Sequence, residues 1–255
     1  MDIEVAKISE DDFSSNLYRS LAQEWYGTNV GPMAIARAQA RAQTPWILER
    51  IRKYIGYRAE VLDVGSGAGF FSNEAARAGH KVTGLDVSEN SLKVAELMDR
   101  TGLVRYVEGD AYRMPFAKES FDVVVALDLL EHVSDPEQIM SEMTRVLRPG
   151  GLLFFHTVNK NPLSYVFVFK GKWLVRNTPF KYYDYSLFRR PDVIEQWCTE
   201  LGLEIQTLQG LRPKILKKSF WRWIWNREIP EDLQFVWGKS KLISYTGCAK
   251  KLREH

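Results

Sequence analysis

The chain has 255 residues, 45% of them hydrophobic, and a formal net charge of +3 at pH 7. This length is enough for one substantial core, and so small a charge does not by itself indicate a nucleic-acid partner. Its two cysteines, Cys198 and Cys248, are too few for a disulfide framework and lack metal-ligand spacing, which fits a reducing compartment.

The amino terminus is acidic where a signal peptide would be basic, and no apolar run approaches the length needed to span a bilayer. We therefore expect one cytoplasmic domain over residues 1–255, with the option that it lies peripherally on the inner face of a membrane. Residues 1–58 are expected to form an amino-terminal helical cap, with two or three helices between 11 and 56. Ile47, Ile51, Tyr54 and Ile55 recur at helical spacing and predict one apolar stripe.

Residues 59–158 alternate between short apolar runs and helical patterns, which predicts a cofactor-binding core. Strands are expected at 60–64, 81–86, 104–108, 121–126 and 151–158, and helices at 70–79, 88–100 and 136–147. This alternation requires a parallel sheet that is covered by helices on both faces. Asp135, Pro136 and Gln138 together form a good helix start.

A glycine-rich turn follows the first of these strands. Gly65, Gly67 and Gly69 allow positive φ and close approach of a ligand to the backbone. A dinucleotide-binding turn would space its glycines as G-x-G-x-x-G, so the third glycine comes one residue early here. Asp63 lies where a cationic group could be held. A nucleoside that has an ammonium group and no phosphate fits this combination, and S-adenosylmethionine is such a ligand.

Acids also end the next two strands. Asp86 lies about twenty residues beyond the first glycine, where a carboxylate bonds ribose hydroxyls, and Asp110 ends the third strand. Such acids can instead cap the following helix, and Asp86 with Ser88 has that pattern too. Together with the apolar strand 121–126 and the turn at 148–151, these segments resemble the ordered motifs of class I S-adenosylmethionine-dependent methyltransferases.

That resemblance implies a Rossmann-like α/β fold with a seven-stranded, mostly parallel sheet. It also implies that the acid at 110 bonds the adenine amine. The implied cofactor-binding residues are Asp63, Gly65, Ser66, Gly67, Gly69, Asp86, Val87, Asp110, Ala111 and Leu127.

Three further segments resemble the O-methyltransferases of ubiquinone biosynthesis, which methylate polyprenylated catechols and phenols. They are residues 127–133, 157–165 and 183–188. The likeness covers roughly residues 60–200 and implies a small aromatic or prenylated acceptor. It is poorer before residue 60, although Trp25 and Tyr26 keep a suggestive arrangement.

Asp128, Glu131 and His132 are the predicted catalytic residues. Ionising a phenol with a pKa of about 10 at pH 7 costs roughly 4 kcal/mol. A general base typically offsets on the order of 3 to 5 kcal/mol, and a divalent metal such as Mg²⁺ could stabilise a catecholate comparably. If 128–132 forms one helical turn, the three side chains share a face and could also bind a metal. His132 thus has three open roles: general base, metal ligand, or structural residue.

Residues 159–190 form an expected substrate-side insert that is rich in aromatic residues. We expect Asn159, Tyr165 and Asp184 to be its substrate contacts, with the aromatic residues holding the acceptor about 3 to 3.5 Å from the methyl group. A wall for a prenyl tail is an equal alternative for these aromatic residues. His80, in an exposed turn, and His156, inside a strand, are expected to be structural.

The carboxy-terminal part, 191–255, is expected to supply a helix at 191–202, a strand at 203–208 and a last, antiparallel strand at 240–249. Within it, residues 212–227 interleave six basic residues with Phe220, Trp221, Trp223 and Trp225. This composition suits a membrane surface, and the alternative is a lid that packs on the sheet.

Several functions are compatible with the same cofactor. A methyltransferase acting on RNA would use the cations and tryptophans of 212–227, but the Asn/Asp-Pro-Pro-aromatic turn of amino-methylating enzymes is missing after the fourth strand. We therefore expect no nucleic-acid partner. A different small-molecule acceptor also remains open, as does a non-catalytic S-adenosylmethionine-binding partner of a biosynthetic assembly. The sequence does not indicate an oligomeric state.

Overall fold

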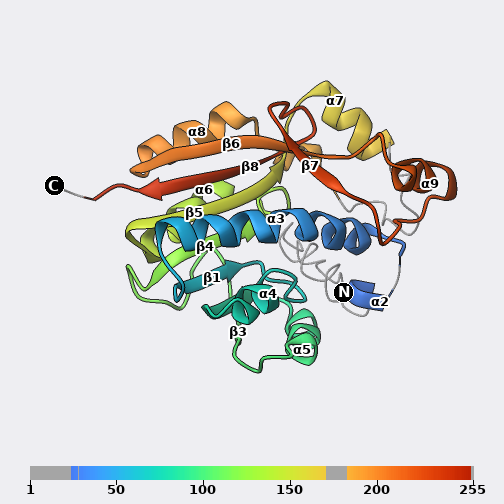
Figure 1. The fold of residues 1–255 in the computed structure, drawn as a ribbon. Helices are drawn as coiled ribbons and strands as arrows, with labels where there is room; N and C mark the ends of the chain where they lie inside the picture. The colour runs from blue at the N-terminus through green and yellow to red at the C-terminus, as the bar shows by residue number, and fades with distance from the viewer. Residues whose placement is uncertain (1–23, 28, 171–182, 254–255) are drawn as a thin grey trace, which may run out of the picture.

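The computed structural model describes residues 24–27, 29–170 and 183–253 (Figure 1). Its first elements are the short helix α2 (Glu24–Gly27) and the long helix α3 (Pro32–Tyr54). One helix of 23 residues thus covers most of the region in which two or three helices were expected, and residues 11–23 of that prediction lie outside the described part. Pro32 occupies the first turn of α3, where its missing amide proton is not needed.

The core alternates strands and helices as the sequence predicts. Its strands are β1 (Glu60–Val64), β2 (Lys81–Asp86), β3 (Arg105–Glu108), β4 (Phe121–Leu127) and β5 (Leu147–Val158). Its helices are α4 (Ser72–Arg77), α5 (Glu89–Met98) and α6 (Pro136–Val146). The side chain of Asp135 accepts a hydrogen bond from the Gln138 amide at 3.0 Å, which confirms the predicted start of α6.

The remaining elements follow the core. They are α7 (Pro162–Tyr165), the π-helix η1 (Val166–Lys170), the 3-10 helix η3 (Tyr185–Leu187), α8 (Pro191–Glu200), β6 (Leu203–Pro213), α9 (Lys218–Asn226), β7 (Phe235–Gly238) and β8 (Ser244–Lys251). Among the described residues, no helix is both long enough and apolar enough to cross a bilayer.

The sheet has eight strands in the order β3-β2-β1-β4-β5-β8-β6-β7, so the expected number of seven is wrong. The first five strands pair in parallel, and β8 lies antiparallel between β5 and β6, as predicted for the last strand. The additional strand is β7. It pairs antiparallel with the end of β6, which therefore continues to Pro213 instead of ending at 208.

Alternate residues of the strands face two separate helical layers. Val123 and Val125 pack with Ile47 of α3, whereas Val124 and Ala126 pack on the side of α6 and α8. Figure 1 shows α3 lying across the sheet. Both faces of the sheet are thus covered by helices, as a parallel sheet requires. The carboxyl ends of the strands remain as the edge where a ligand can reach the backbone.

Candidate functional site

The turn after β1 has the backbone conformation that its glycines predict. The φ angles of Gly65, Gly67 and Gly69 are 70°, 51° and 79°. The amides of Gly65 and Ser66 both donate to the Leu85 carbonyl oxygen, which holds the turn against β2. The hydroxyl oxygen of Ser66 is buried and has no hydrogen-bond partner among the described residues. A buried polar atom without a partner is costly, so a ligand that bonds it would be stabilised here.

Trp25 of α2 covers this turn. A Cβ atom added to Gly67 would lie 2.6 Å from Cη2 of Trp25, so only glycine permits this approach. Tyr26 donates to the Ala68 carbonyl oxygen at 3.0 Å and packs on Phe70 with 4.9 Å between ring centroids. Trp25 and Tyr26 thus cover the glycine turn.

Two carboxylates flank the turn at the ends of β1 and β2. Asp63 is buried and accepts a hydrogen bond from the Ser72 hydroxyl at 2.6 Å, and burial raises its pKa to about 7. Asp86 accepts from the amides of Gly67 at 2.8 Å and Ser88 at 2.9 Å, and burial raises its pKa as well. Asp86 therefore supports the turn and the start of α5 at once, and its contact with ribose hydroxyls stays a prediction.

The third predicted acid lies after β3. Asp110 is exposed and accepts from the Tyr112 amide through one carboxylate oxygen at 2.8 Å. Ala111 and Leu127 are half-buried, and Val87 is exposed. These side chains would give an adenine ring apolar contacts beside one acceptor of hydrogen bonds.

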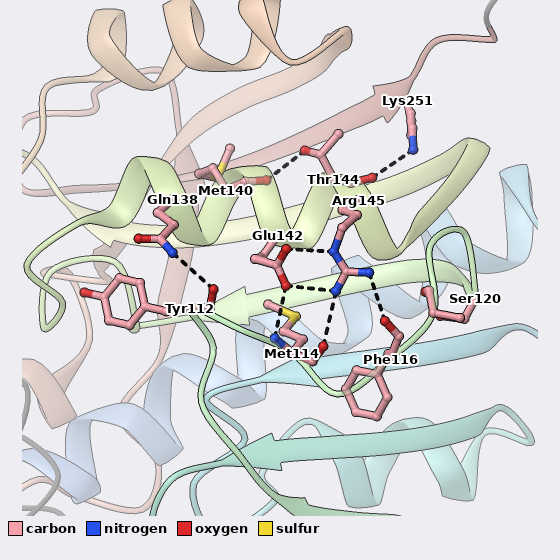
Figure 2. A network of polar contacts seen from close by, with 11 residues as sticks. Tyr112, Met114, Phe116, Ser120, Gln138, Met140, Glu142, Thr144, Arg145 and Lys251 are labelled. Atoms are coloured by element: carbon pink, nitrogen blue, oxygen red, sulfur yellow. Dashed lines mark hydrogen bonds and ion pairs between the residues drawn. The ribbon is translucent and has the colours of Figure 1, made fainter.

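A clamp on α6 fixes the loop that follows Asp110 and Ala111 (Figure 2). Arg145 donates to the carbonyl oxygens of Phe116 at 2.9 Å and Met114 at 3.2 Å, and Glu142 accepts from the Met114 amide at 3.0 Å. Arg145 and Glu142 also form an ion pair at 2.7 Å. The loop is thus held by both members of a charged pair.

The segment after β4 is a turn and not the expected helical turn. Asp128 has a φ of 55°, in the left-handed region, and the His132 amide donates to the Leu129 carbonyl oxygen at 2.9 Å. A Cβ atom on Gly65 would lie 3.0 Å from Cδ1 of Leu129, so this turn contacts the glycine turn directly. The premise that a helix aligns Asp128, Glu131 and His132 on one face is therefore wrong.

These three side chains have different neighbours. Asp128 Oδ1 lies 3.5 Å from Nε2 of His156, and Glu131 accepts from the Thr157 hydroxyl at 2.8 Å. The ring of His132 stacks on Tyr183 at 5.3 Å between centroids. Among the described residues, no group of three or more His, Cys, Asp or Glu side chains is arranged to hold a metal ion. These side chains as placed do not form a ligand set for Mg²⁺.

Burial controls the ionisation of this region. It raises the pKa of Asp128 and of Glu131 well above the usual range of a carboxyl group, and it lowers the pKa of His132 and of His156 to about 3. Both imidazoles are therefore neutral near pH 7. The carboxyl groups titrate closer to neutrality, where a general base is most effective.

The insert 159–190 is described at its two ends, and its Trp173, Phe180 and Tyr182 lie outside the described residues. Asn159 is buried at the end of β5 and donates to the Lys241 carbonyl oxygen, while its Oδ1 has no partner among the described residues. Tyr165 is partly exposed and stacks on Phe169 at 5.0 Å. Asp184 is exposed and caps η3 by accepting from the Ser186 amide at 2.8 Å. The structure brings Asn159 to the strand ends and places the other two farther along the insert.

Several residues at the site had not been predicted to take part in it. His156 and Thr157 of β5 contact the two predicted carboxylates, and Ser72 contacts Asp63. Only the pairing of Leu127 with His156 across β4 and β5 brings these groups together, and a single strand gives no signal of that register. His80 was expected to be exposed but is buried and accepts from the Ala59 amide at 3.2 Å.

Comparison with known proteins agrees with this geometry. Residues 62–155 match the model of a methyltransferase domain family. The ubiquinone biosynthesis O-methyltransferase of Nitrosococcus oceani is 37% identical over 212 residues, covering 75% of this chain and 90% of that protein. The enzyme of the same name from Leptothrix cholodnii is 33% identical over 181 residues, covering 69% of this chain and 76% of that protein.

The fold is shared with solved methyltransferase structures. An S-adenosylmethionine-dependent methyltransferase from Methanosarcina mazei superposes with a TM-score of 0.58 at 23% identity, covering 80% of this chain and 98% of that one. The curated relatives are aligned over more than two thirds of their own length. This chain is therefore an S-adenosylmethionine-dependent methyltransferase and belongs to the family of the ubiquinone biosynthesis O-methyltransferases.

Proposed function

We propose that this enzyme methylates a hydroxyl oxygen of a small aromatic acceptor, a phenol or catechol of the polyprenylated kind used in quinone biosynthesis. The names of its relatives support this acceptor class. The observation that carries the proposal is the half-buried carboxylate of Asp128, which lies beside His156 on a turn that contacts the glycine turn. This position is suited to take a proton from an acceptor that approaches the cofactor.

The cofactor would lie over the strand ends of β1, β2 and β3. Asp63 would face its ammonium group, Asp86 its ribose hydroxyls and Asp110 its adenine amine. Gly65, Ser66, Gly67 and Gly69 would line the backbone side, with Val87, Ala111 and Leu127 against the base. The Ser66 hydroxyl, which has no hydrogen-bond partner among the described residues, and the buried carboxyl groups of Asp63 and Asp86 fit such a ligand. When bound, S-adenosylmethionine supplies an electrophilic methyl group on a sulfonium.

Asp128 would act as the general base. Its pKa is raised by burial, so the carboxylate is a stronger base than an exposed aspartate and matches a phenol more closely. If the Thr246 hydroxyl donates to Nδ1 of His156, a contact of 2.7 Å, then the His156 Nε2 proton points toward Asp128 Oδ1. His156 would thereby orient the carboxylate and stabilise its charged form.

Glu131 and His132 would complete the acceptor side. The hydroxyl of Thr157 fixes one oxygen of Glu131, and the carboxyl group would accept from a second phenolic hydroxyl. His132 is neutral and stacks on Tyr183, so its role would be to position the ring rather than to take the proton. Their proposed roles involve no metal ion, because the described His, Cys, Asp and Glu side chains are not arranged as a ligand set.

Asn159 and the aromatic residues of the insert would hold the acceptor. The partnerless Oδ1 of Asn159 can accept a hydrogen bond from an acceptor hydroxyl at the end of β5. Tyr165 would contribute to a wall for an apolar tail together with Phe169 and Tyr185, whose rings pack on one another, and Asp184 would keep that wall in place by capping η3. An acceptor with a long prenyl chain resides in a bilayer, so a peripheral position on a membrane belongs to the same proposal.

A turnover assay with labelled S-adenosylmethionine tests this function. We expect methylated product from at least one member of a panel of phenols, catechols and prenylated analogues, and a fall in kcat of about 10²- to 10⁴-fold in Asp128→Asn. The rate should rise with pH as the raised pKa of Asp128 is passed, because a base must be ionised to accept a proton. Asp192→Asn, which weakens an exposed ion pair with Arg190 at the start of α8, serves as the matched control and should keep near-normal kcat.

Calorimetry of cofactor binding distinguishes a defect in proton transfer from a defect in cofactor binding. Asp128→Asn should bind S-adenosylhomocysteine like the wild type, because its defect lies in proton transfer. If the wild-type protein binds the cofactor but methylates no member of the panel, the acceptor class is wrong. If Asp128→Asn turns over at the wild-type rate, the assignment of the base is wrong.

A further inference from the structure

The chain concentrates positive charge in one short segment. Residues 212–227 contain six of the 35 lysines and arginines, three of the eight tryptophans and none of the acids, so the rest of the chain has a negative formal charge. Most of this segment forms α9 and the turn that leads into it. Figure 1 shows α9 at the margin of the molecule, beyond the end of the sheet.

One side of α9 is part of the core. Ser219 and Trp223 are each only 2% exposed, and Trp223 packs with Ala34 and Ala38 of α3 and with Ile229. This side of the helix therefore packs on the core, against α3 rather than as a lid on the sheet. The buried side of α9 holds the helix in place. The opposite side of the helix therefore remains exposed to solvent.

The outer side exposes large apolar side chains. Trp221 is 62% exposed, Trp225 is 88% exposed, and Leu216 in the preceding turn is 92% exposed. Ile215 beside it is 48% exposed. Single exposed apolar residues such as Leu97 are ordinary on a protein surface, whereas four of them within eleven residues mark an interaction site.

Cations surround these apolar groups. Lys218 and Arg222 are one helical turn apart, as are Trp221 and Trp225, so all four point outward from the same side. Lys217 and Lys218 are exposed, and neither forms an ion pair with another residue of the described part. Arg222 pairs with Asp232 across the exposed surface. We name the outer α9 face by its residues Ile215, Leu216, Lys217, Lys218, Trp221, Arg222 and Trp225.

We propose that the outer α9 face docks this enzyme on the surface of a bilayer that contains anionic lipid. Tryptophan rings are favoured at the level of lipid headgroups, and lysines nearby are attracted to anionic lipid. The aliphatic side chains of Ile215 and Leu216 fit an acyl boundary and offer nothing to a stacked base or a phosphate. This inference does not depend on the acceptor class, because it uses only exposed groups outside the site.

Flotation with lipid vesicles tests the docking. The 255-residue chain is mixed with vesicles of phosphatidylcholine alone or of phosphatidylcholine with phosphatidylglycerol, at low and at high salt. We expect binding to the anionic vesicles that weakens with salt. Trp221→Ser with Trp225→Ser, and separately Lys217→Gln with Lys218→Gln, should each lower the partition coefficient by about tenfold or more.

Matched variants elsewhere on the surface serve as controls. Leu97→Ser with Leu103→Ser removes comparably exposed apolar groups, and Lys118→Gln with Lys250→Gln removes two exposed cations. Both should bind vesicles like the wild type. All four variants should retain the wild-type rate with a water-soluble, short-chain acceptor, which confirms folding and separates this result from the proposed function. If no acceptor is methylated, the vesicle result is still decisive.

Three results would overturn the inference. They are equal flotation of the wild type and both α9 variants, binding that does not depend on anionic lipid, and binding of an RNA oligonucleotide at physiological salt that the same substitutions abolish.

Discussion

Asp63 is buried and lies near a second acid, Asp86. Burial and the neighbouring Asp86 both raise its pKa, to about 7, while the Ser72 hydroxyl opposes the shift. Because the pKa is higher in the folded than in the unfolded chain, the folded protein binds more protons between about pH 4 and pH 7. The contribution of Asp63 to stability is therefore lost as the pH rises toward 7, and a bound cation would restore it.

This gives a prediction for cofactor affinity. If the ammonium of the ligand lies against Asp63, binding stabilises the carboxylate and releases its proton. The affinity for S-adenosylhomocysteine should then rise about tenfold between pH 6 and pH 8 and level off above the raised pKa. Titration calorimetry in buffers of different ionisation enthalpy would measure both the affinity and the released proton.

Asp63→Asn isolates the effect, because the ligand's own ionisation is common to both proteins. The variant should bind more weakly, keep its contact with Ser72 and lose the pH dependence attributed to Asp63. A pH dependence identical to that of the wild type would mean that Asp63 does not face the cation.

The loop after β3 is held in position by α6. Arg145 and Glu142 on successive turns of the helix bind three backbone groups of that loop (Figure 2). The loop begins with Asp110 and Ala111, which are predicted to contact the adenine. A helix on one face of the sheet thus determines the geometry of a binding loop at its edge.

Arg145→Met should release the loop after β3 from helix α6. Losing hydrogen bonds from a charged donor is expected to lower the free energy of unfolding by about 1 to 3 kcal/mol, and cofactor affinity should fall severalfold because Asp110 is less well held. Thermal unfolding with and without S-adenosylhomocysteine measures both effects. Arg77→Met is the matched control, since the ion pair of Arg77 with Glu74 is exposed and its loss should cost about 0 to 1 kcal/mol. Equal effects of the two substitutions would show that the loop does not depend on the clamp.

The elements differ in how well the sequence predicts them, and the reasons are physical. The glycine turn, the parallel strands and the start of α6 depend on local signals and were predicted correctly. β7 has four residues, all half-buried, and gives no alternating pattern, so its existence depends on pairing with β6. The left-handed φ of Asp128 and its approach to His156 likewise arise from packing between segments that are distant in the sequence.

The reactivity of the two cysteines measures how readily the sheet and its covering helix α8 open. Cys248 lies in β8 and Cys198 in α8, both are buried, and burial raises the pKa of each thiol to about 12. A thiol with such a pKa is almost entirely protonated near neutrality and reacts slowly. Both sites should therefore become reactive only when the surrounding structure opens.

Labelling with a thiol reagent at pH 8 should be at least about 10³-fold slower in the native enzyme than in guanidinium chloride. Cofactor should slow it further by stabilising the folded state. The single variants Cys198→Ala and Cys248→Ala assign the two rates. Rapid labelling of Cys248 in the native state would mean that β8 separates readily from its neighbours.

The placement of β8 between β5 and β6 also bears on how the chain is made. β5 is almost wholly apolar from Leu152 to Phe155, and its free side is covered only when Ser244–Lys251 has been synthesised. Until then, the nascent chain has an unpaired strand edge, and such an edge promotes aggregation. A ribosome-bound intermediate lacking β8 should consequently be a preferred client of chaperones.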